Sequence, residues 1–393
     1  MGKGNTSDDE LSCQKYGVPL YGAAWVPPAA AAAAAAVETE VSSTEPETPA
    51  SYAVDRHIVL AGGGGEGRSG IPNALLLSTF DFDSSSLSVQ PVAKLGTGSD
   101  LPYRIAVHPG GEGLICSFPK SCRWFEWDLA TSTDEHTLNL KSSEKVLEQL
   151  EDVGQQLAMT FNFEGSLLAV GGEDGKLRVF KWSTMESILN EANAHPSVKD
   201  LDFSPDGKFL VSVGVGPGRI WNVATSTSIA LLPNENNEVF GFCRFSRTSD
   251  TDQVLYITAM RDKGCSIVKW NTTSWNRISS THIVRDPVSA FNVSPDGKLL
   301  AIGTIQGDIF IVSSASMRLQ TVVRKAHLVL VTALAFSRDS RALVSASPAS
   351  SARVTLIKDK KKDGTSLWII LFIILLAIAV YYAKSKEFFP LKP

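Results

Sequence analysis

The sequence predicts an all-β fold, because one strand and turn pattern recurs along most of the chain. Each copy has an alternating apolar strand, a turn resembling Ser-Pro-Asp-Gly, a second apolar strand, a Gly-rich turn and a third strand. Clear copies begin at Leu157, Val198, Val288 and Val331, and weaker copies begin at Ile105 and Phe242. Their spacing of about 40 to 50 residues is typical of WD repeats, in which four short strands form one propeller blade.

Together with the unit His57–Phe82, these copies predict a seven-bladed WD40-type β-propeller over residues 16–357. An unrelated all-β sandwich would explain the strands, but not a repeated turn at a fixed offset. The segment Tyr16–Val26 is strand-like and is expected either to add a strand to the first blade or to close the ring against the last. The remaining segments of this region are interpreted as a flexible N-terminus (1–15), a disordered Ala/Pro-rich insertion (27–52) and an extended interblade loop (131–152).

A C-terminal segment has the composition of a membrane span. Residues 367–383 (LWIILFIILLAIAVYYA) are uncharged and nearly all apolar, and as a helix they would be roughly 26 Å long. A basic linker (358–366) precedes the segment, and a short tail (384–393) follows it. Since no N-terminal signal for translocation is recognised, the expected topology is a tail anchor in the endoplasmic-reticulum membrane, with the propeller in the cytosol and the tail in the lumen.

Composition excludes several classes of function. The net charge of −4 gives no electrostatic reason to expect a nucleic-acid partner. The five cysteines show no C-x-x-C spacing, which argues against a disulfide framework and a zinc site. No nucleophile elbow or isolated carboxylate pair is present, so the chain is expected to be a regulatory protein without covalent chemistry. His195 and His327 precede first strands of blades and are predicted to be structural, and Asp174, Asp206 and Asp296 are predicted to form turns.

The segment Gly62–Asn73 (GGGGEGRSGIPN) is the principal candidate for function. Half of its residues are glycine, although two residues suffice to connect hairpin strands. It matches P-loop and dinucleotide patterns superficially, but both require a following helix. Here Ile71 and Pro72 oppose a helix and Ala74–Phe82 has the pattern of a strand, so phosphate binding is not expected.

Backbone carbonyls offer this segment another task. Successive glycines and turn residues can direct carbonyl oxygens toward one centre, and a ring of carbonyls coordinates a monovalent cation. A potassium ion is the candidate ligand, and the disordered surface loop remains the alternative. The candidate ligating residues are Gly62, Gly63, Gly64, Gly65, Glu66 and Gly67.

Two motifs together carry a resemblance to a known family. The segment 16–25 (YGVPLYGAAW) followed by 60–73 (LAGGGGEGRSGIPN) resembles the endoplasmic-reticulum WD-repeat guanine-nucleotide exchange factors for Sar-type GTPases. That family includes prolactin regulatory element-binding protein. The resemblance implies that the glycine-rich loop binds potassium through its backbone and inserts against the GTPase switch region. It further implies that Asn73, after Ile71 and Pro72, is central to exchange, and that the outcome is COPII recruitment for transport from the endoplasmic reticulum to the Golgi.

The Ala/Pro insertion and the short C-terminal tail are most similar to a plant branch of this family, the phosphate transporter traffic facilitators. That resemblance implies an alternative: a non-catalytic accessory protein that promotes export of phosphate transporters.

Arg68, within the glycine-rich segment, is interpreted as a solvated surface residue of the loop.

Overall fold

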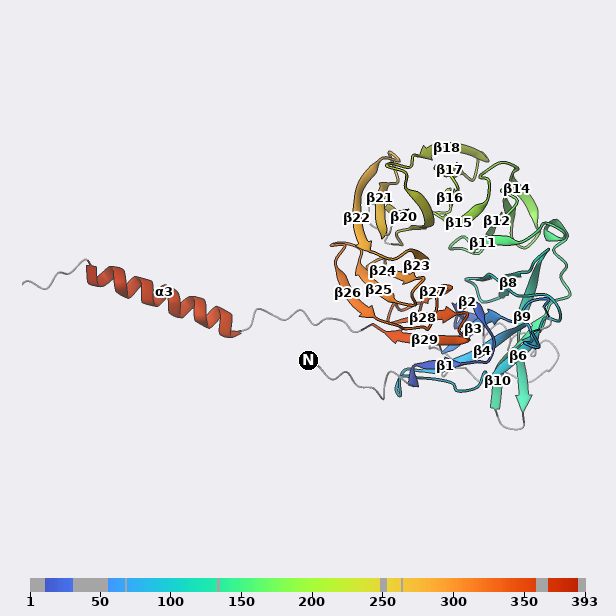
Figure 1. Cartoon of the computed structure of the whole chain (residues 1–393), viewed down its shortest axis with the longest axis horizontal. Helices are drawn as coiled ribbons and strands as arrows, with labels where there is room; N and C mark the ends of the chain where they lie inside the picture. The colour runs from blue at the N-terminus through green and yellow to red at the C-terminus, as the bar shows by residue number, and fades with distance from the viewer. Residues whose placement is uncertain are drawn as a thin grey trace, which may run out of the picture. The chain divides into compact units, whose positions relative to one another are not determined.

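A computed structural model describes residues 11–30, 56–67, 69–132, 135–247, 253–262, 264–357 and 367–387. The chain divides into two compact units, Met1–Leu356 and Ile357–Pro393. The first unit contains seven antiparallel sheets arranged around a common axis, which confirms the predicted seven-bladed propeller (Figure 1).

Blades are numbered here in chain order, with strands given from the inner to the outer edge. Blade 1 comprises β2 (Leu20–Trp25), β3 (His57–Gly62), β4 (Ala74–Asp81) and β6 (Ala93–Gly96), and the short β5 (Ser86–Leu87) pairs with the end of β4. Blade 2 comprises β7 (Ile105–Val107), β8 (Gly113–Ser117), β9 (Cys122–Ser132) and β10 (Glu135–Ser142). Blade 3 comprises β11 (Gln156–Phe161), β12 (Leu167–Gly172), β13 (Leu177–Lys181) and β14 (Glu186–Glu191).

Blades 4 to 7 have the same four-stranded plan. Blade 4 comprises β15 (Val198–Phe203), β16 (Phe209–Gly214), β17 (Gly218–Asn222) and β18 (Thr227–Leu232), and blade 5 comprises β19 (Val239–Phe245), β20 (Val254–Arg261), β21 (Gly264–Asn271) and β22 (Arg277–Val284). Blade 6 comprises β23 (Val288–Val293), β24 (Leu299–Thr304), β25 (Ile309–Ser313) and β26 (Leu319–Val323). Blade 7 comprises β27 (Ala333–Phe336), β28 (Ala342–Ser347), β29 (Ser351–Leu356) and β1 (Cys13–Lys15).

The segment Tyr16–Val26 adds a strand to the first blade, which is one of its two predicted roles, whereas residues 13–15, predicted to be flexible, close the ring against the last blade. β1 pairs with β29 as the outer strand of blade 7, with Gln14 opposite Ala352, and β2 becomes the inner strand of blade 1. The propeller therefore begins before the predicted boundary at residue 16, because a short strand gains backbone partners on an edge that would otherwise stay open.

Two other segments differ from their predicted structure or lie mostly outside the described residues. Residues 131–132 and 135–142 of the expected interblade loop 131–152 belong instead to blade 2, because β9 continues to Ser132 and pairs with β10 from Phe125 onward. A 3-10 turn, Glu148–Leu150, follows. The expected insertion 27–52 lies mostly outside the described residues, although Ala30 near its start is fully buried.

The repeated turns explain why the sequence forms these hairpins. In blade 4, Ser204 Oγ donates to Asp206 Oδ1 at 2.6 Å and accepts from Phe209 N at 2.9 Å, while Gly207 has a φ of +69°. Blade 6 repeats this turn with Ser294 and Asp296. The predicted role of these aspartates as turn formers is confirmed.

The hydrophobic core lies between neighbouring blades. One cluster joins blades 7 and 1 through Leu60, Leu76 and Val344, and similar layers follow around the ring to the layer between blades 5 and 6. The predicted structural histidines are also confirmed: His195 Nε2 lies 2.9 Å from Ser212 Oγ, and His327 contacts Ser345 and Ser351.

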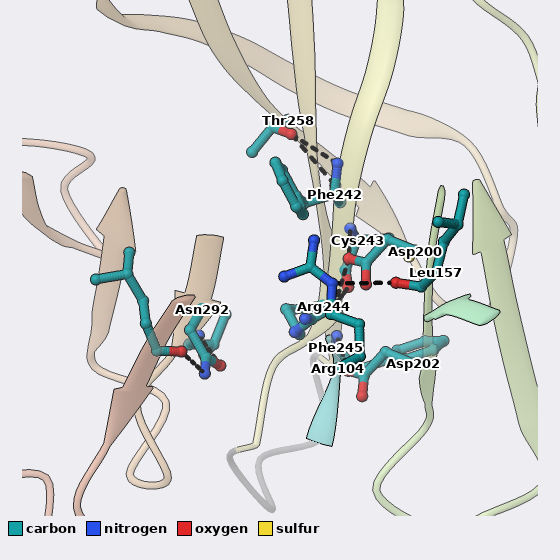
Figure 2. Close-up of polar contacts among 12 residues, drawn as sticks. Arg104, Leu157, Asp200, Asp202, Phe242, Cys243, Arg244, Phe245, Thr258 and Asn292 are labelled. Carbon is teal, nitrogen blue, oxygen red and sulfur yellow. Dashed lines mark hydrogen bonds and ion pairs between the residues drawn. The ribbon is translucent and has the colours of Figure 1, made fainter. Parts of the chain in front are cut away.

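Charged side chains form hydrogen bonds and ion pairs between blades near the inner strands (Figure 2). Arg104 Nε donates to the Leu157 carbonyl of blade 3 at 3.2 Å, and Nη1 donates to Thr332 O at 3.0 Å. Asp200 of β15 accepts from Cys243 N at 2.9 Å and pairs with Arg244 of β19. Burial raises the pKa of Asp200, and the Arg244 charge opposes that rise.

The described part of the second unit contains the helix α3 (Leu367–Glu387). Among the described residues, no helix has both the length and the hydropathy of a membrane span. The predicted span 367–383 therefore stays a prediction.

Candidate functional site

The glycine-rich segment 62–73, called the glycine loop below, connects β3 to β4 in blade 1. The register of blade 1 places Leu20, Gly62, Ala74 and Gly96 opposite one another at the same end of its four strands. The connectors that join consecutive blades therefore lie on the same face of the propeller as the turns that join the second strand of a blade to its third strand. This face is called the loop face. The glycine loop lies on this face.

The start of the loop is packed too closely for side chains. Gly63 N donates to Pro19 O at 2.9 Å, and a Cβ on Gly62 would lie 2.0 Å from that oxygen. A Cβ on Gly63 would lie 2.2 Å from Asn73 Oδ1 and 2.5 Å from Asn73 Cα. Glycine is required here because backbone and Asn73 occupy the space of a side chain.

Asn73 closes the loop from its other end. Its side chain is 4% exposed, and Oδ1 accepts from Gly65 N at 2.9 Å. The amide nitrogen Nδ2 donates to Ser99 O at 3.0 Å, to Gly98 O at 3.1 Å and to Gly65 O at 3.3 Å. One buried amide thus ties the glycine loop to the connector that follows β6.

The solvent-facing part of the loop lies between its two tied ends. Glu66, Gly67, Ser69, Gly70 and Pro72 are exposed, while Ile71 is half-buried and packs against the core between blades 7 and 1. The three residues predicted for exchange are therefore placed differently: Pro72 faces solvent, Ile71 anchors the loop, and Asn73 points inward. Arg68 lies outside the described residues.

The six predicted potassium ligands do not all have free carbonyls. Gly62 belongs to β3 and pairs with Leu20 and Ala74, so its backbone forms part of the sheet. The Gly65 carbonyl converges with those of Gly98 and Ser99 on Asn73 Nδ2, so it already accepts a hydrogen bond. Among the described residues, no group of three or more His, Cys, Asp or Glu side chains could hold a metal.

Sequence reasoning missed the connector 97–100 as part of this site. The connector is braced by Thr97 Oγ1, which donates to Asp100 O at 2.8 Å, and by the ion pair between Asp100 and Arg123. Gly98 and Ser99 follow β6, the strand that pairs with β4, after one intervening residue, and this position beside the loop is the signal that could have identified the connector.

Comparison with known proteins places this geometry in a family. Residues 152–181 and 187–216 match the model of the WD domain, G-beta repeat. SEC12-like protein 2 of Arabidopsis thaliana is 49% identical over 357 residues, which is 90% of each chain, and SEC12-like protein 1 of the same plant is 31% identical over 82% of each. The guanine nucleotide-exchange factor SEC12 of Rattus norvegicus is 27% identical over 215 residues, 51% of each chain. The chain therefore belongs to the SEC12 family of WD-repeat proteins, within its plant SEC12-like branch.

Proposed function

We propose that this chain is a guanine-nucleotide exchange factor that promotes GDP release from a Sar-type small GTPase at the endoplasmic-reticulum membrane. Release of GDP allows GTP to bind, and the loaded GTPase starts COPII vesicle formation. The observation that carries the proposal is the glycine loop on the loop face of the propeller, tied at both ends with its tip exposed, in a chain related to named exchange factors.

Exchange requires only differential binding. A factor that binds the nucleotide-free GTPase more tightly than the GDP-bound form shifts the equilibrium toward release. In this proposal the exposed tip inserts against the switch region of the GTPase; its described residues are Glu66, Gly67, Ser69, Gly70 and Pro72. Asn73 acts as a positioning residue, because its amide groups are already committed to the loop and to residues 98–99.

The membrane anchor and the cation belong to the same proposal. Residues 367–383 would span the membrane, with the basic linker 358–366 on the cytosolic side and the tail 384–393 in the lumen. A potassium ion would bind carbonyls among the predicted ligands Gly62–Gly67 other than those of Gly62 and Gly65, which the sheet and Asn73 already occupy, and would stiffen the tip. Replacing potassium by lithium is then expected to slow exchange and increase amide hydrogen exchange in the loop; unchanged values would contradict the cation.

The direct test measures fluorescent GDP release from a purified Sar-type GTPase, with the full chain in detergent. The expected result is release accelerated at least tenfold over the intrinsic rate, with the acceleration lost in Asn73→Ala. Equal acceleration by both proteins would contradict the role of Asn73.

The alternative is a non-catalytic accessory for export of phosphate transporters. Two relatives are named SEC12-like proteins rather than exchange factors, which is the observation that favours it. No acceleration by the wild-type chain, together with retention of phosphate transporters in the endoplasmic reticulum when the chain is deleted, would favour this alternative over exchange.

A further inference from the structure

The connector between blades 6 and 7 exposes three consecutive aliphatic side chains. Leu328 is 78% exposed, Val329 41% and Leu330 38%, whereas the flanking His327 and Val331 are buried. In the described part of the propeller, no other run of three large aliphatic residues is exposed in this way. Contiguous apolar exposure is costly in water and marks interaction surfaces.

The backbone holds this run in place. His327 N donates to Gly307 O at 3.1 Å and Val331 N donates to Thr304 O at 3.1 Å. A Cβ on Gly307 would lie 2.1 Å from His327 O and 2.7 Å from Val329 O, so the turn and the connector are tightly packed. The same turn carries Ile305, which is 43% exposed. The four side chains, called the apolar ledge (Ile305, Leu328, Val329 and Leu330), are therefore presented by fixed backbone.

The ledge and the glycine loop flank one short segment. Thr332, which follows the ledge, donates through Oγ1 to Leu20 O at 2.8 Å, and Gly63 donates to Pro19 O at 2.9 Å. Blades 7 and 1 are neighbours in the ring, and both features lie on the loop face. A partner that covers the loop tip is thus adjacent to the ledge.

We propose that the apolar ledge is a second docking surface for the small GTPase, which buries an apolar segment on it while the glycine loop contacts the switch region. This inference rests on the proposed function, and it supplies affinity that the small polar loop tip lacks. The GTPase is favoured over a lipid surface because β29 ends at Leu356, paired with Ala342, at the edge opposite the loop face. After Leu356 the chain leaves blade 7 at the end of its strands that is opposite the ledge.

The test replaces Leu328, Val329 and Leu330 together by Ser in the full chain in detergent. The expected result is a KM for the GTPase raised about tenfold or more, equivalent to about 1.4 kcal/mol of binding, with kcat unchanged. Phe163→Ser is the matched control, since Phe163 is 70% exposed in the turn between the first and second strands of blade 3, on the opposite face. Wild-type KM in the triple variant would overturn the proposal.

Two further measurements keep the outcomes separate. In the triple variant, binding of nucleotide-free GTPase to the full chain is expected to weaken by the same factor as KM rises. If the triple variant unfolds, Leu328→Ser alone is expected to weaken this binding about threefold. A defect seen in liposomes but absent in detergent would assign the ledge to the membrane and overturn the inference. A wild-type chain that neither binds the GTPase nor accelerates exchange would contradict the proposed function as well, whereas wild-type exchange with an unaffected ledge variant would contradict the ledge alone.

Discussion

Asn73 and Gly65 bind each other in both directions: the Gly65 amide donates to Asn73 Oδ1 at 2.9 Å, and Asn73 Nδ2 reaches the Gly65 carbonyl at 3.3 Å. The same nitrogen contacts the carbonyls of Gly98 and Ser99. This buried side chain, together with the Gly63–Pro19 hydrogen bond and the packing of Ile71, therefore constrains the path of a loop that composition alone would leave unconstrained. The glycines provide the space for this arrangement, because side chains at residues 62 and 63 would collide with Pro19 and Asn73.

The first prediction concerns the Asn73 amide. Asn73→Asp keeps an acceptor for Gly65 N but removes the donor to Gly98 and Ser99 and turns a carboxylate toward their carbonyls. We expect a loss of stability of about 1–3 kcal/mol and faster amide hydrogen exchange in residues 63–73. Hydrogen–deuterium exchange with mass spectrometry measures both effects. Wild-type protection of the loop in this variant would show that Asn73 does not hold it.

The second prediction concerns closure of the ring. Arg104 donates to carbonyls of blades 1, 3 and 7, at Tyr21, Leu157 and Thr332. Arg104→Met leaves these carbonyls without their charged donor, so we expect a loss of about 2 kcal/mol or more in the free energy of unfolding. Urea denaturation checks this value. The control is Arg318→Met at an exposed position, which is expected to change stability by less than about 0.5 kcal/mol.

The third prediction is a dependence of stability on pH. Burial lowers the pKa of His195 and His327 from 6.5 to about 4, with smaller effects from Arg219 and Arg353 respectively. The unfolded chain therefore takes up protons first as the pH falls. This stabilisation is complete above pH 6.5 and is lost as the pH falls toward 4, by up to roughly 3 kcal/mol for each histidine.

Urea unfolding at pH 7, 6 and 5 measures this dependence. In His327→Gln we expect lower stability at pH 7, because its contacts with Ser345 and Ser351 change, but a shallower decline toward pH 5. A decline as steep as that of the wild type would contradict the assignment of His327.

The propeller could be predicted from the sequence because its repeats are local. The Ser-Pro-Asp-Gly turns form through contacts within a few residues, as at Ser204, Asp206 and Phe209. Blade 2 was harder to predict, because its outer strand β10 pairs with an extended β9 in a segment that is polar and rich in serine. The orientation of Asn73 could not be predicted, since it depends on the carbonyls of residues 98 and 99, which reach the site only once β6 pairs with β4.

The central claim is that the ordered glycine loop is the part of the molecule that accelerates GDP release. One comparison of exchange rates tests this claim most directly. A Cβ on Gly63 would collide with Asn73, whereas a Cβ on Gly67 would meet nothing within 4 Å. With a Sar-type GTPase and the full chain, Gly63→Ala is expected to lower kcat/KM for GDP release at least tenfold, or by about 1.4 kcal/mol, while Gly67→Ala stays within about twofold of the wild type. Equal rates for Gly63→Ala and the wild type, in folded protein, would contradict the account.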